Sequence, residues 1–319
     1  MLVQATNLKK YFPMQRFRFG KAKHYVKAVD DVSLTVYQGE TLGLVGESGC
    51  GKSTLGRTLL GVYPPTAGTV TFEGEDIAAR PKAERKRLKQ KMQLIFQDPS
   101  GSLNPRRRVK DIVAEPFIIH HLLSKSAREQ RIRELLDVVG ISTHFLERYP
   151  HELSGGQKQR IGIARALALH PKLVICDEAV SALDVSIQAQ VLDLLEKLQQ
   201  EFQLTYLFIS HDLNVVYHIS DRVGVMYLGK IVEIGDCQNL YFNPRHPYTQ
   251  ALLSAIPEID PEQRQGKIVL EGDLPSPANP PTGCRFHPRC WKAFDRCSQE
   301  EPVLQATSSN HYVACHAVS

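Results

Sequence analysis

The order of apolar and polar stretches along the chain predicts a fold in which strands alternate with helices. Three short apolar runs, at 41–45, 173–177 and 205–209, have the length and composition of buried strands. Apolar residues at helical spacing between 187 and 198 predict a helix that packs an apolar stripe on the sheet. Further strands are predicted at 2–5, 32–36, 68–72 and 91–97, with a hairpin over 223–234. This alternation is typical of an α/β fold with a doubly wound, mostly parallel sheet, in which ligands bind beyond the carboxyl ends of the strands.

Three segments depart from this alternation. Residues 13–28 are basic and irregular, and we expect a loop there. Residues 80–91 are rich in Lys and Arg, which can mean a nucleic-acid patch or the solvated face of a helix; the second interpretation is favoured because such charge runs are usually solvated. Residues 98–165 are expected to be mostly helical, with apolar residues at helical spacing from Ile132 to Val139.

A glycine-rich motif follows the first buried strand and precedes a helical stretch that ends before Pro64 and Pro65. It fits the pattern G-x-x-x-x-G-K-[S/T] of the P-loop, which binds nucleotide phosphates through backbone N–H groups at a helix N-terminus. Lys52 would reach the β- and γ-phosphates, and Ser53 would hold Mg²⁺. The motif predicts a nucleotide site formed by Gly46, Glu47, Ser48, Gly49, Cys50, Gly51, Lys52, Ser53 and Thr54.

Polar residues with suitable chemistry follow three other predicted strands. Asp177 and Glu178 end the strand at 173–177, where Asp177 could position Mg²⁺ and Glu178 could polarise the attacking water. Gln97 ends the strand at 91–97, and His211 follows the strand at 205–209. Because these positions share one edge of a parallel sheet with the P-loop, we expect them to form one catalytic site.

A second phosphate-binding motif, Leu153-Ser154-Gly155-Gly156-Gln157, opens a predicted helix. One chain cannot easily direct two such motifs at one γ-phosphate, whereas two chains arranged head to tail can. The motif resembles the signature of the ABC-type ATPases, and the order of the other motifs agrees. The resemblance covers residues 1 to about 255.

The resemblance implies an ABC-type nucleotide-binding domain with a RecA-like core, an antiparallel β subdomain and an inserted helical subdomain at about 98–165. It also implies a composite ATP site. One subunit would supply the P-loop, Gln97 as the Q-loop, Asp177, Glu178 and the switch residue His211, while its partner supplies Ser154, Gly155, Gly156 and Gln157. Gln97 would join Ser53 and Asp177 around Mg²⁺, and Phe12 or alternatively Tyr25 would stack on adenine. The family usually has proline after the catalytic glutamate; Ala179 stands here, and we still expect hydrolysis.

Residues 243–253 resemble the start of the carboxy-terminal extension in peptide-permease ATPases, and the runs 96–99 and 102–106 are similar to that subfamily as well. The resemblance implies an F-type subunit that drives dipeptide or oligopeptide uptake. Its implied partners are a second ATPase subunit, in a heterodimer, two transmembrane permease subunits and an extracytoplasmic peptide-binding protein. We expect an ATPase domain at 1–257 and an extension at 258–319, after a rise in proline content.

The extension contains Cys284, Cys290, Cys297 and Cys315, with the spacing C-x5-C-x6-C-x17-C. This spacing lacks the C-x2-C of common zinc ribbons, and four thiolates in a loop-like segment suit a [4Fe–4S] cluster. The subfamily resemblance favours the cluster; zinc and free thiols are the alternatives. His287, His311 and His316 are possible substitute ligands, whereas Cys50, Cys176 and Cys237 are expected to be buried or incidental.

Composition places few further limits on function. The 319 residues carry 39 basic and 34 acidic side chains, and this net charge of +5 does not call for a nucleic-acid partner. The chain starts without a signal-peptide pattern and holds no run of eighteen apolar residues, so we expect a cytoplasmic protein. The resemblance to permease ATPases implies that it lies peripherally on the cytoplasmic face of the inner membrane.

Other functions remain open. The cargo could be a nickel chelate or haem, because cargo specificity resides in other subunits. A non-transport ABC ATPase acting on DNA or ribosomes is a second alternative, although no coiled coil or second nucleotide domain is evident. An iron–sulfur redox sensor is the third, and only the cysteine segment favours it.

Overall fold

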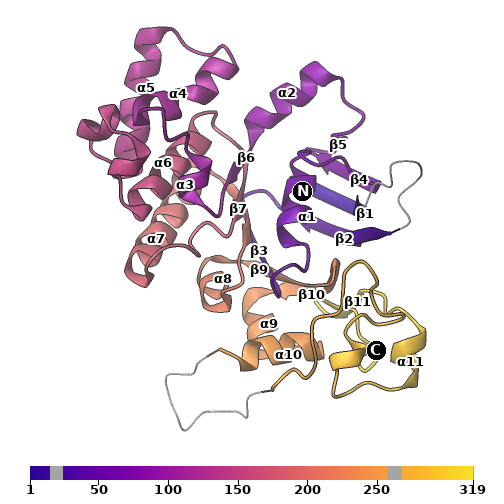
Figure 1. The fold of residues 1–319 in the computed structure, drawn as a ribbon. Helices are drawn as coiled ribbons and strands as arrows, with labels where there is room; N and C mark the ends of the chain where they lie inside the picture. The colour runs from indigo at the N-terminus through magenta and orange to yellow at the C-terminus, as the bar shows by residue number, and fades with distance from the viewer. Residues whose placement is uncertain (15–23, 257–267, 319) are drawn as a thin grey trace. The chain divides into compact units, whose positions relative to one another are not determined.

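The computed structural model describes residues 1–14, 24–256 and 268–318. Contacts between residues divide the chain into two compact units. Unit 1 comprises residues 1–79 and 210–319, and unit 2 comprises residues 80–209. Each unit is described by itself below, with elements labelled as in Figure 1.

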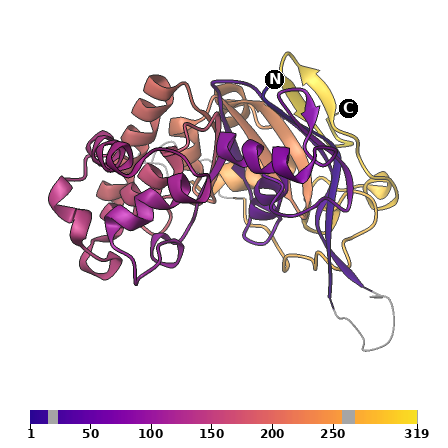
Figure 2. The same ribbon diagram turned by 90° about the horizontal axis from the view of Figure 1, so that it is seen from above.

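The amino-terminal part of unit 1 is an antiparallel sheet. It contains β1 (Val3–Pro13), β2 (Tyr25–Val36), β4 (Ala67–Phe72) and β5 (Glu75–Asp76), in the order β2-β1-β4-β5. Val3 pairs with Val36 on one side and with Phe72 on the other, and all three side chains are buried. The sheet therefore has a buried apolar face, and Figure 2 shows β1 and β2 lying side by side.

The second sheet of unit 1 carries the P-loop. Its first strand, β3 (Thr41–Val45), runs parallel to β9 (Arg222–Tyr227), and β10 (Lys230–Asp236) forms a hairpin with β9. The carboxy-terminal segment extends this sheet, because β12 (His311–Val313) pairs with β10 and β11 (Gln305–Ser308) pairs with β12. The helices of the unit are α1 (Lys52–Leu59), α8 (Leu213–Ile219), α9 (Cys237–Phe242), α10 (Pro247–Ser254) and α11 (Asp295–Gln299), with a 3₁₀ turn, η4, at His287–Arg289.

Unit 2 consists of a parallel sheet and a group of helices. The strands β6 (Met92–Ile95), β7 (Leu173–Asp177) and β8 (Thr205–Ile209) lie in the order β6-β7-β8. All residues of β7 and β8 are buried, as expected for parallel strands covered on both faces. The helices are α2 (Lys82–Lys91), α3 (Pro99–Ser102), α4 (Val109–Ile119), α5 (Lys125–Val138), α6 (Gly155–Leu167) and α7 (Val185–Phe202), with 3₁₀ turns η1 (Thr143–Glu147) and η2 (Pro150–Glu152).

Most predicted elements are present, and the clearest error concerns residues 13–28. The loop prediction is wrong at both ends, since β1 continues to Pro13 and β2 begins at Tyr25. Backbone pairing of Phe12 with Val26 keeps this part of the chain extended although its basic side chains show no apolar alternation. The rest of the predicted loop, at 15–23, lies outside the described residues.

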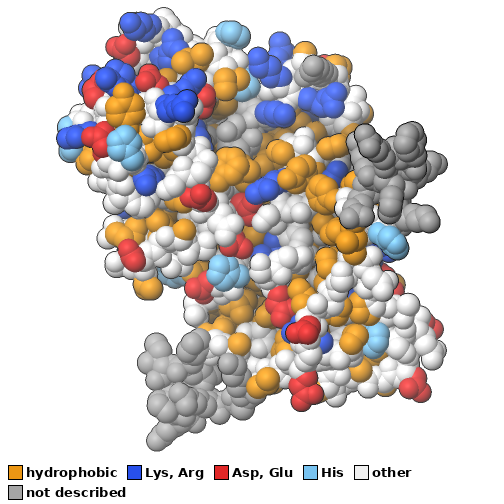
Figure 3. All heavy atoms as spheres, viewed as in Figure 1, with side chains coloured by type: hydrophobic (Ala, Val, Ile, Leu, Met, Phe, Trp, Pro, Cys, Tyr) orange, Lys and Arg blue, Asp and Glu red, His pale blue; other side chains and the backbone are white. Residues whose placement is uncertain are grey.

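The basic run at 80–91 forms α2, in agreement with the preferred interpretation. Its Arg85, Lys86 and Arg87 side chains are exposed, while Leu88 is buried. Figure 3 shows Lys and Arg side chains gathered over α2. Among the helices that the structure describes, none has the length and apolar character needed to cross a bilayer.

Candidate nucleotide-binding site

The P-loop in unit 1 connects β3 to α1, and its glycines are required by the backbone. Gly46 and Gly51 have φ angles of +147° and +110°, which L side chains rarely adopt. A Cβ atom at Gly51 would lie 1.9 Å from the Ala28 carbonyl oxygen, and one at Gly46 would lie 2.1 Å from that of Met226. The predicted pattern of glycines therefore reflects both backbone conformation and close packing against β2 and β9.

The Lys52 side chain lies inside the P-loop and is hydrogen-bonded to its backbone. Its side chain is buried, and its Nζ atom donates hydrogen bonds to the carbonyl oxygens of Gly46 at 2.7 Å and Glu47 at 3.1 Å. Burial raises the pKa of the neighbouring Cys50 thiol, an effect that the Lys52 charge opposes. Ser48 and Gly49 are exposed at the tip, so the outer face of the loop is open to a ligand.

His211 lies at the same end of the sheet as the P-loop. The N–H of Ser210 donates to the carbonyl oxygen of Leu44 at 3.2 Å, which fixes the chain next to the end of β3. His211 follows directly and is exposed, and Asp212 then caps α8 by accepting from the N–H of Asn214 at 2.9 Å. Unit 1 therefore holds both the P-loop, which follows β3, and the predicted switch residue His211, whose neighbour Ser210 is hydrogen-bonded to the end of β3.

In unit 2, the predicted catalytic carboxylate contacts the predicted Q-loop glutamine. The Nε2 atom of Gln97 donates to Oε2 of Glu178 at 2.7 Å. Asp177 is buried at the end of β7, and the next residue, Glu178, has a φ of +50°, an unusual value that turns the chain sharply at the strand end. The N–H of Glu178 donates to the carbonyl oxygen of Ile209 at 2.9 Å, which holds this turn beside β8.

The Ser-Gly-Gly motif also lies in unit 2 and begins α6. Ser154 caps the helix by accepting from the N–H of Gln157 at 3.3 Å, and the Gln157 side chain accepts from the N–H of Ser154 at 2.9 Å. A Cβ at Gly156 would lie 2.6 Å from Cγ2 of Ile187 on α7, so this position needs glycine for packing. Ser154 and Gly155 are exposed at the positive end of the helix dipole, as an anion-binding motif requires.

The structure thus groups the predicted residues in two sets. Unit 1 holds the P-loop and His211, whereas unit 2 holds Gln97, Asp177, Glu178 and the Ser-Gly-Gly motif. Oxygen ligands from Asp177, Gln97 and Ser53 suit Mg²⁺, a hard cation that prefers oxygen. Within unit 2, the hydrogen bond between Gln97 and Glu178 brings two of the predicted catalytic residues into direct contact.

The two candidate adenine-stacking residues have different surroundings. The Phe12 ring packs edge-on against Tyr63, with 5.4 Å between ring centroids, and Lys10 Nζ lies 5.0 Å above the Phe12 ring. Tyr25 is 43% exposed at the start of β2. Packing contacts therefore already engage Phe12, and Tyr25 has the more accessible ring.

Comparisons with known proteins agree with this arrangement of motifs. Residues 29–181 match the family described as ABC transporter, and residues 232–297 match the oligopeptide/dipeptide transporter C-terminal region. The chain is 54% identical to the oligopeptide transport ATP-binding protein AppF of Bacillus subtilis, over 100% of this chain and 98% of that protein. The chain belongs to the ABC transporter ATP-binding proteins. It is accordingly an ABC-type ATPase.

Further ABC transporter ATP-binding proteins support the assignment along the whole length. The dipeptide transport ATP-binding protein DppF of Escherichia coli is 51% identical over 99% of this chain and 94% of its own. A solved dimeric ATP-binding cassette in a post-hydrolysis state with ADP and phosphate covers 74% of this chain and 99% of its own, at 28% identity and a TM-score of 0.66. That solved protein is a dimer.

The predicted four-cysteine cluster is not supported. Cys297 is buried and Cys284, Cys290 and Cys315 are partly buried. No group of three or more His, Cys, Asp or Glu side chains within residues 1–14, 24–256 and 268–318 is arranged to hold a metal ion. Burial raises the pKa of Cys284 to about 11, and the other three cysteines act in the same direction, so the Cys284 thiol stays protonated without a cation nearby. The cysteine spacing therefore predicted a cluster that the arrangement of these side chains does not support.

The histidines proposed as substitute ligands have other partners. His311 is buried and its Nε2 lies 2.7 Å from Oε1 of Glu233 on β10. His287 Nδ1 lies 2.8 Å from the Cys284 carbonyl oxygen, and His316 Nε2 lies 2.9 Å from that of Glu300. Cys50, Cys176 and Cys237 are buried, as predicted.

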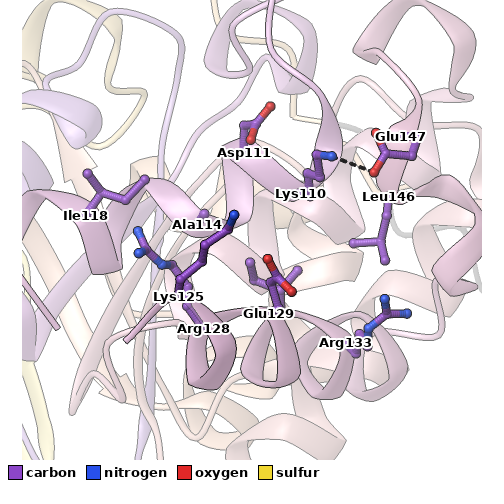
Figure 4. Close-up of a pocket in the computed structure, with 11 residues that line it drawn as sticks. Lys110, Asp111, Ala114, Ile118, Lys125, Arg128, Glu129, Arg133, Leu146 and Glu147 are labelled. Carbon is purple, nitrogen blue, oxygen red and sulfur yellow. Dashed lines mark hydrogen bonds and ion pairs between the residues drawn. The ribbon is translucent and has the colours of Figure 1, made fainter. Parts of the chain in front are cut away.

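A cavity of about 470 Å³ in unit 2 contains none of the predicted nucleotide residues (Figure 4). It lies among α4, α5 and η1, where Lys110 forms an ion pair with Glu147 at 2.6 Å. Its lining mixes four basic and three acidic side chains with apolar ones: Lys110, Asp111, Ala114, Ile118, Lys125, Arg128, Glu129, Ile132, Arg133, Leu146 and Glu147. This mixture does not have the positive character of a phosphate site.

Sequence reasoning missed the residues that support the P-loop from the carboxy-terminal segment. The hydroxyl of Tyr248 accepts from the N–H of Glu47 at 2.8 Å, and the guanidinium of Arg289 pairs with the Glu47 carboxylate at 2.8 Å. Tyr248 belongs to the run at 243–253 that carried the subfamily resemblance, which was the available signal, but its partner could not be read from it.

Proposed function

We propose that this chain energises an ABC importer for dipeptides or oligopeptides. Identity of about half over full length to oligopeptide and dipeptide transport ATP-binding proteins supports the cargo class. The match of residues 232–297 to the oligopeptide/dipeptide transporter C-terminal region supports it independently of the ATPase motifs. The proposed domains are an ATPase at 1–257 and a permease-type extension at 258–319.

The proposed catalytic site is composite. Lys52 leaves its carbonyl partners and binds the β- and γ-phosphates, while Glu178 polarises the attacking water and His211 stabilises charge on the γ-phosphate. Mg²⁺ would be held by Ser53, Asp177 and Gln97 and would neutralise phosphate charge. The hydrogen bond from Gln97 to Glu178 supports the pairing of the Q-loop with the general base, because it fixes the carboxylate before the substrate is present. Either Phe12 or Tyr25 stacks on adenine.

The proposed partner supplies the second half of each site. A second ATPase subunit, in a heterodimer, would present its own signature motif to this chain's nucleotide, and this chain would present Ser154, Gly155 and Gly156 in return. Exposure of Ser154 and Gly155 at the N-terminus of α6 supports the proposal. Two transmembrane permease subunits and an extracytoplasmic peptide-binding protein complete the complex, on the cytoplasmic side of the inner membrane.

The deciding experiment is peptide uptake by the reconstituted complex. The permease subunits, both ATPase subunits and the binding protein are placed in vesicles, and labelled dipeptides and tripeptides are offered with and without ATP. ATP-dependent uptake that is lost with Lys52→Ala supports the proposal. Uptake of a nickel chelate or haem instead of peptides would refute the proposed cargo class. Co-purification with nucleic acid or ribosomes, without membrane subunits, would refute the proposed transport function.

We also propose that the four cysteines of the extension bind a [4Fe–4S] cluster, with zinc as the alternative. Supporting observations are that Cys290, Cys297 and Cys315 all act to raise the pKa of Cys284, and that the Phe286 backbone forms a hydrogen bond with Cys284. Such N–H groups stabilise thiolate sulfur. Iron and sulfide content and visible absorbance of protein prepared without oxygen would distinguish the cluster from zinc, and metal-free protein with four titratable thiols would exclude both.

A further inference from the structure

The carboxy-terminal extension contributes a cation to the phosphate-binding loop. Arg289 donates from Nη1 to Oε2 of Glu47 at 2.8 Å and from Nη2 to Oε1 at 3.2 Å, a two-point guanidinium–carboxylate pair. The Arg289 side chain is 8% exposed and that of Glu47 is 27% exposed. Both residues belong to unit 1, although 242 positions separate them in the sequence.

The segment that carries Arg289 is anchored at several points. Arg285 is buried and donates to the Asp30 carboxylate and to the carbonyl oxygen of Leu228. Phe286 is buried against Tyr227 and Tyr248, with ring centroids 5.3 Å and 5.4 Å away. The backbone that carries Arg289 is therefore anchored by contacts other than the ion pair of Arg289 with Glu47.

The pairing of Arg289 with Glu47 matters for nucleotide binding because Glu47 carries a carboxylate within the P-loop. Glu47 is the second residue of the P-loop, where an ionised carboxylate would repel the phosphates that the loop binds. Arg289 cancels this charge. The Tyr248 hydroxyl holds the Glu47 N–H at 2.8 Å and so fixes the same residue from the backbone side.

We propose that Arg289 is a positioning residue of the nucleotide site, which neutralises Glu47 so that the P-loop can accept a triphosphate. The inference rests on the proposed role of the P-loop. It assigns the carboxy-terminal extension a direct part in ATP affinity, in addition to any role as a scaffold. The extension acts through Glu47 and does not itself touch the nucleotide.

The test measures nucleotide affinity of the full-length chain by competition with a fluorescent ATP analogue. Arg289→Gln should weaken MgATP binding on the order of tenfold, from the interaction of one unit charge with a nearby polyanion. ADP carries less charge, so its affinity should fall less, and the preference for ATP over ADP should decrease. Arg289→Lys should recover part of the loss. Arg296→Gln is the matched control, because Arg296 lies in the same extension and forms an exposed ion pair with Glu300, the residue that follows α11.

A charge cycle separates neutralisation from mere packing. The effect of Arg289→Gln should be much smaller in a Glu47→Gln background, since no carboxylate then needs a partner. An unchanged affinity in Arg289→Gln, an equal loss for ATP and ADP, or the same loss in the Glu47→Gln background would overturn the inference. Fluorescence of Trp291, the only tryptophan, checks that the extension remains folded in each variant. Lys52→Ala tests the P-loop separately: normal binding there would refute the proposed site, whereas lost binding with an inert Arg289 would refute only this inference.

Discussion

Arg285 should be the residue whose removal most weakens attachment of the carboxy-terminal extension. Its guanidinium is buried with the Asp30 carboxylate, which also accepts a hydrogen bond from the Tyr11 hydroxyl. Burial alone would raise the pKa of Asp30, but the hydrogen bond from Tyr11 and the charge of Arg285 outweigh it and lower the pKa. Arg285→Met would keep much of the side-chain volume and leave this carboxylate without its counter-charge.

The cost can be bounded from the chemistry of Asp30. A buried carboxylate without a counter-charge can become neutral by binding a proton. Protonating an ordinary Asp at pH 7 costs about 4 kcal/mol, and this value is the upper limit on the loss of stability. Breaking a buried pair by removing one partner costs about 3–5 kcal/mol in measured cases. We therefore expect Arg285→Met to lower the free energy of unfolding by about 3–4 kcal/mol at pH 7.

The pH dependence follows from the sign of the shift. In the natural chain the pKa of Asp30 is lower in the folded state, so its contribution to stability is present above the unfolded pKa and is lost as pH falls through the folded value. In Arg285→Met the folded pKa would be raised instead. The deficit should then be largest at neutral pH and should shrink as pH falls from the raised folded pKa towards about 4, the unfolded pKa of Asp, and further below it.

The assay is urea unfolding of the full-length chain followed by the fluorescence of Trp291, which lies in the extension. Arg296→Met is the matched control, because its ion pair with Glu300 is exposed and screened by solvent, so its loss should change the free energy of unfolding far less than Arg285→Met does. The double variant Asp30→Asn with Arg285→Met should be more stable than Arg285→Met alone. A loss below about 1 kcal/mol, or a double variant no more stable than the single one, would refute the reasoning.

Three further predictions concern the nucleotide site and its support. Glu178→Gln should bind ATP but hydrolyse it at least about a hundredfold more slowly, measured as phosphate release, and turnover at the normal rate would remove Glu178 as general base. Gly51→Ala should abolish ATP binding in a competition assay, since its Cβ would lie 1.9 Å from the Ala28 carbonyl oxygen at a φ of +110°; the matched change Gly39→Ala meets nothing within 4 Å and should retain binding. Burial lowers the pKa of His246 to about 4, so stability should fall as pH drops from 6.5 towards 4, by up to roughly 3 kcal/mol. His246→Asn keeps a helix-capping side chain and should flatten that pH profile, and an unaltered profile would show that another group titrates.

Local patterns in the sequence were sufficient for much of the fold and for the individual motifs. Buried parallel strands such as 173–177 are continuous apolar runs, and the P-loop glycines are specified by backbone conformation. Charge at 80–91 was correctly interpreted as a solvated helix. The strand ends at 13 and 25 were not predictable, because pairing between β1 and β2 determines them and their side chains show no alternation.

Tertiary structure alone decided which of these motifs act on one another. Gln97 meets Glu178 across 81 positions, and Arg289 meets Glu47 across 242, and no periodicity along the chain records either pair. The cysteine spacing likewise predicted a metal cluster that the side chains in the described part of the chain are not arranged to form. Hydrophobic periodicity and glycine patterns in the sequence reflect the local backbone conformation. Contacts between polar side chains that are far apart in the sequence depend on how the strands and loops that carry them pack together. For this protein the sequence therefore determined the parts of an ATPase, and the packing of the extension within unit 1 determined which residues support its P-loop.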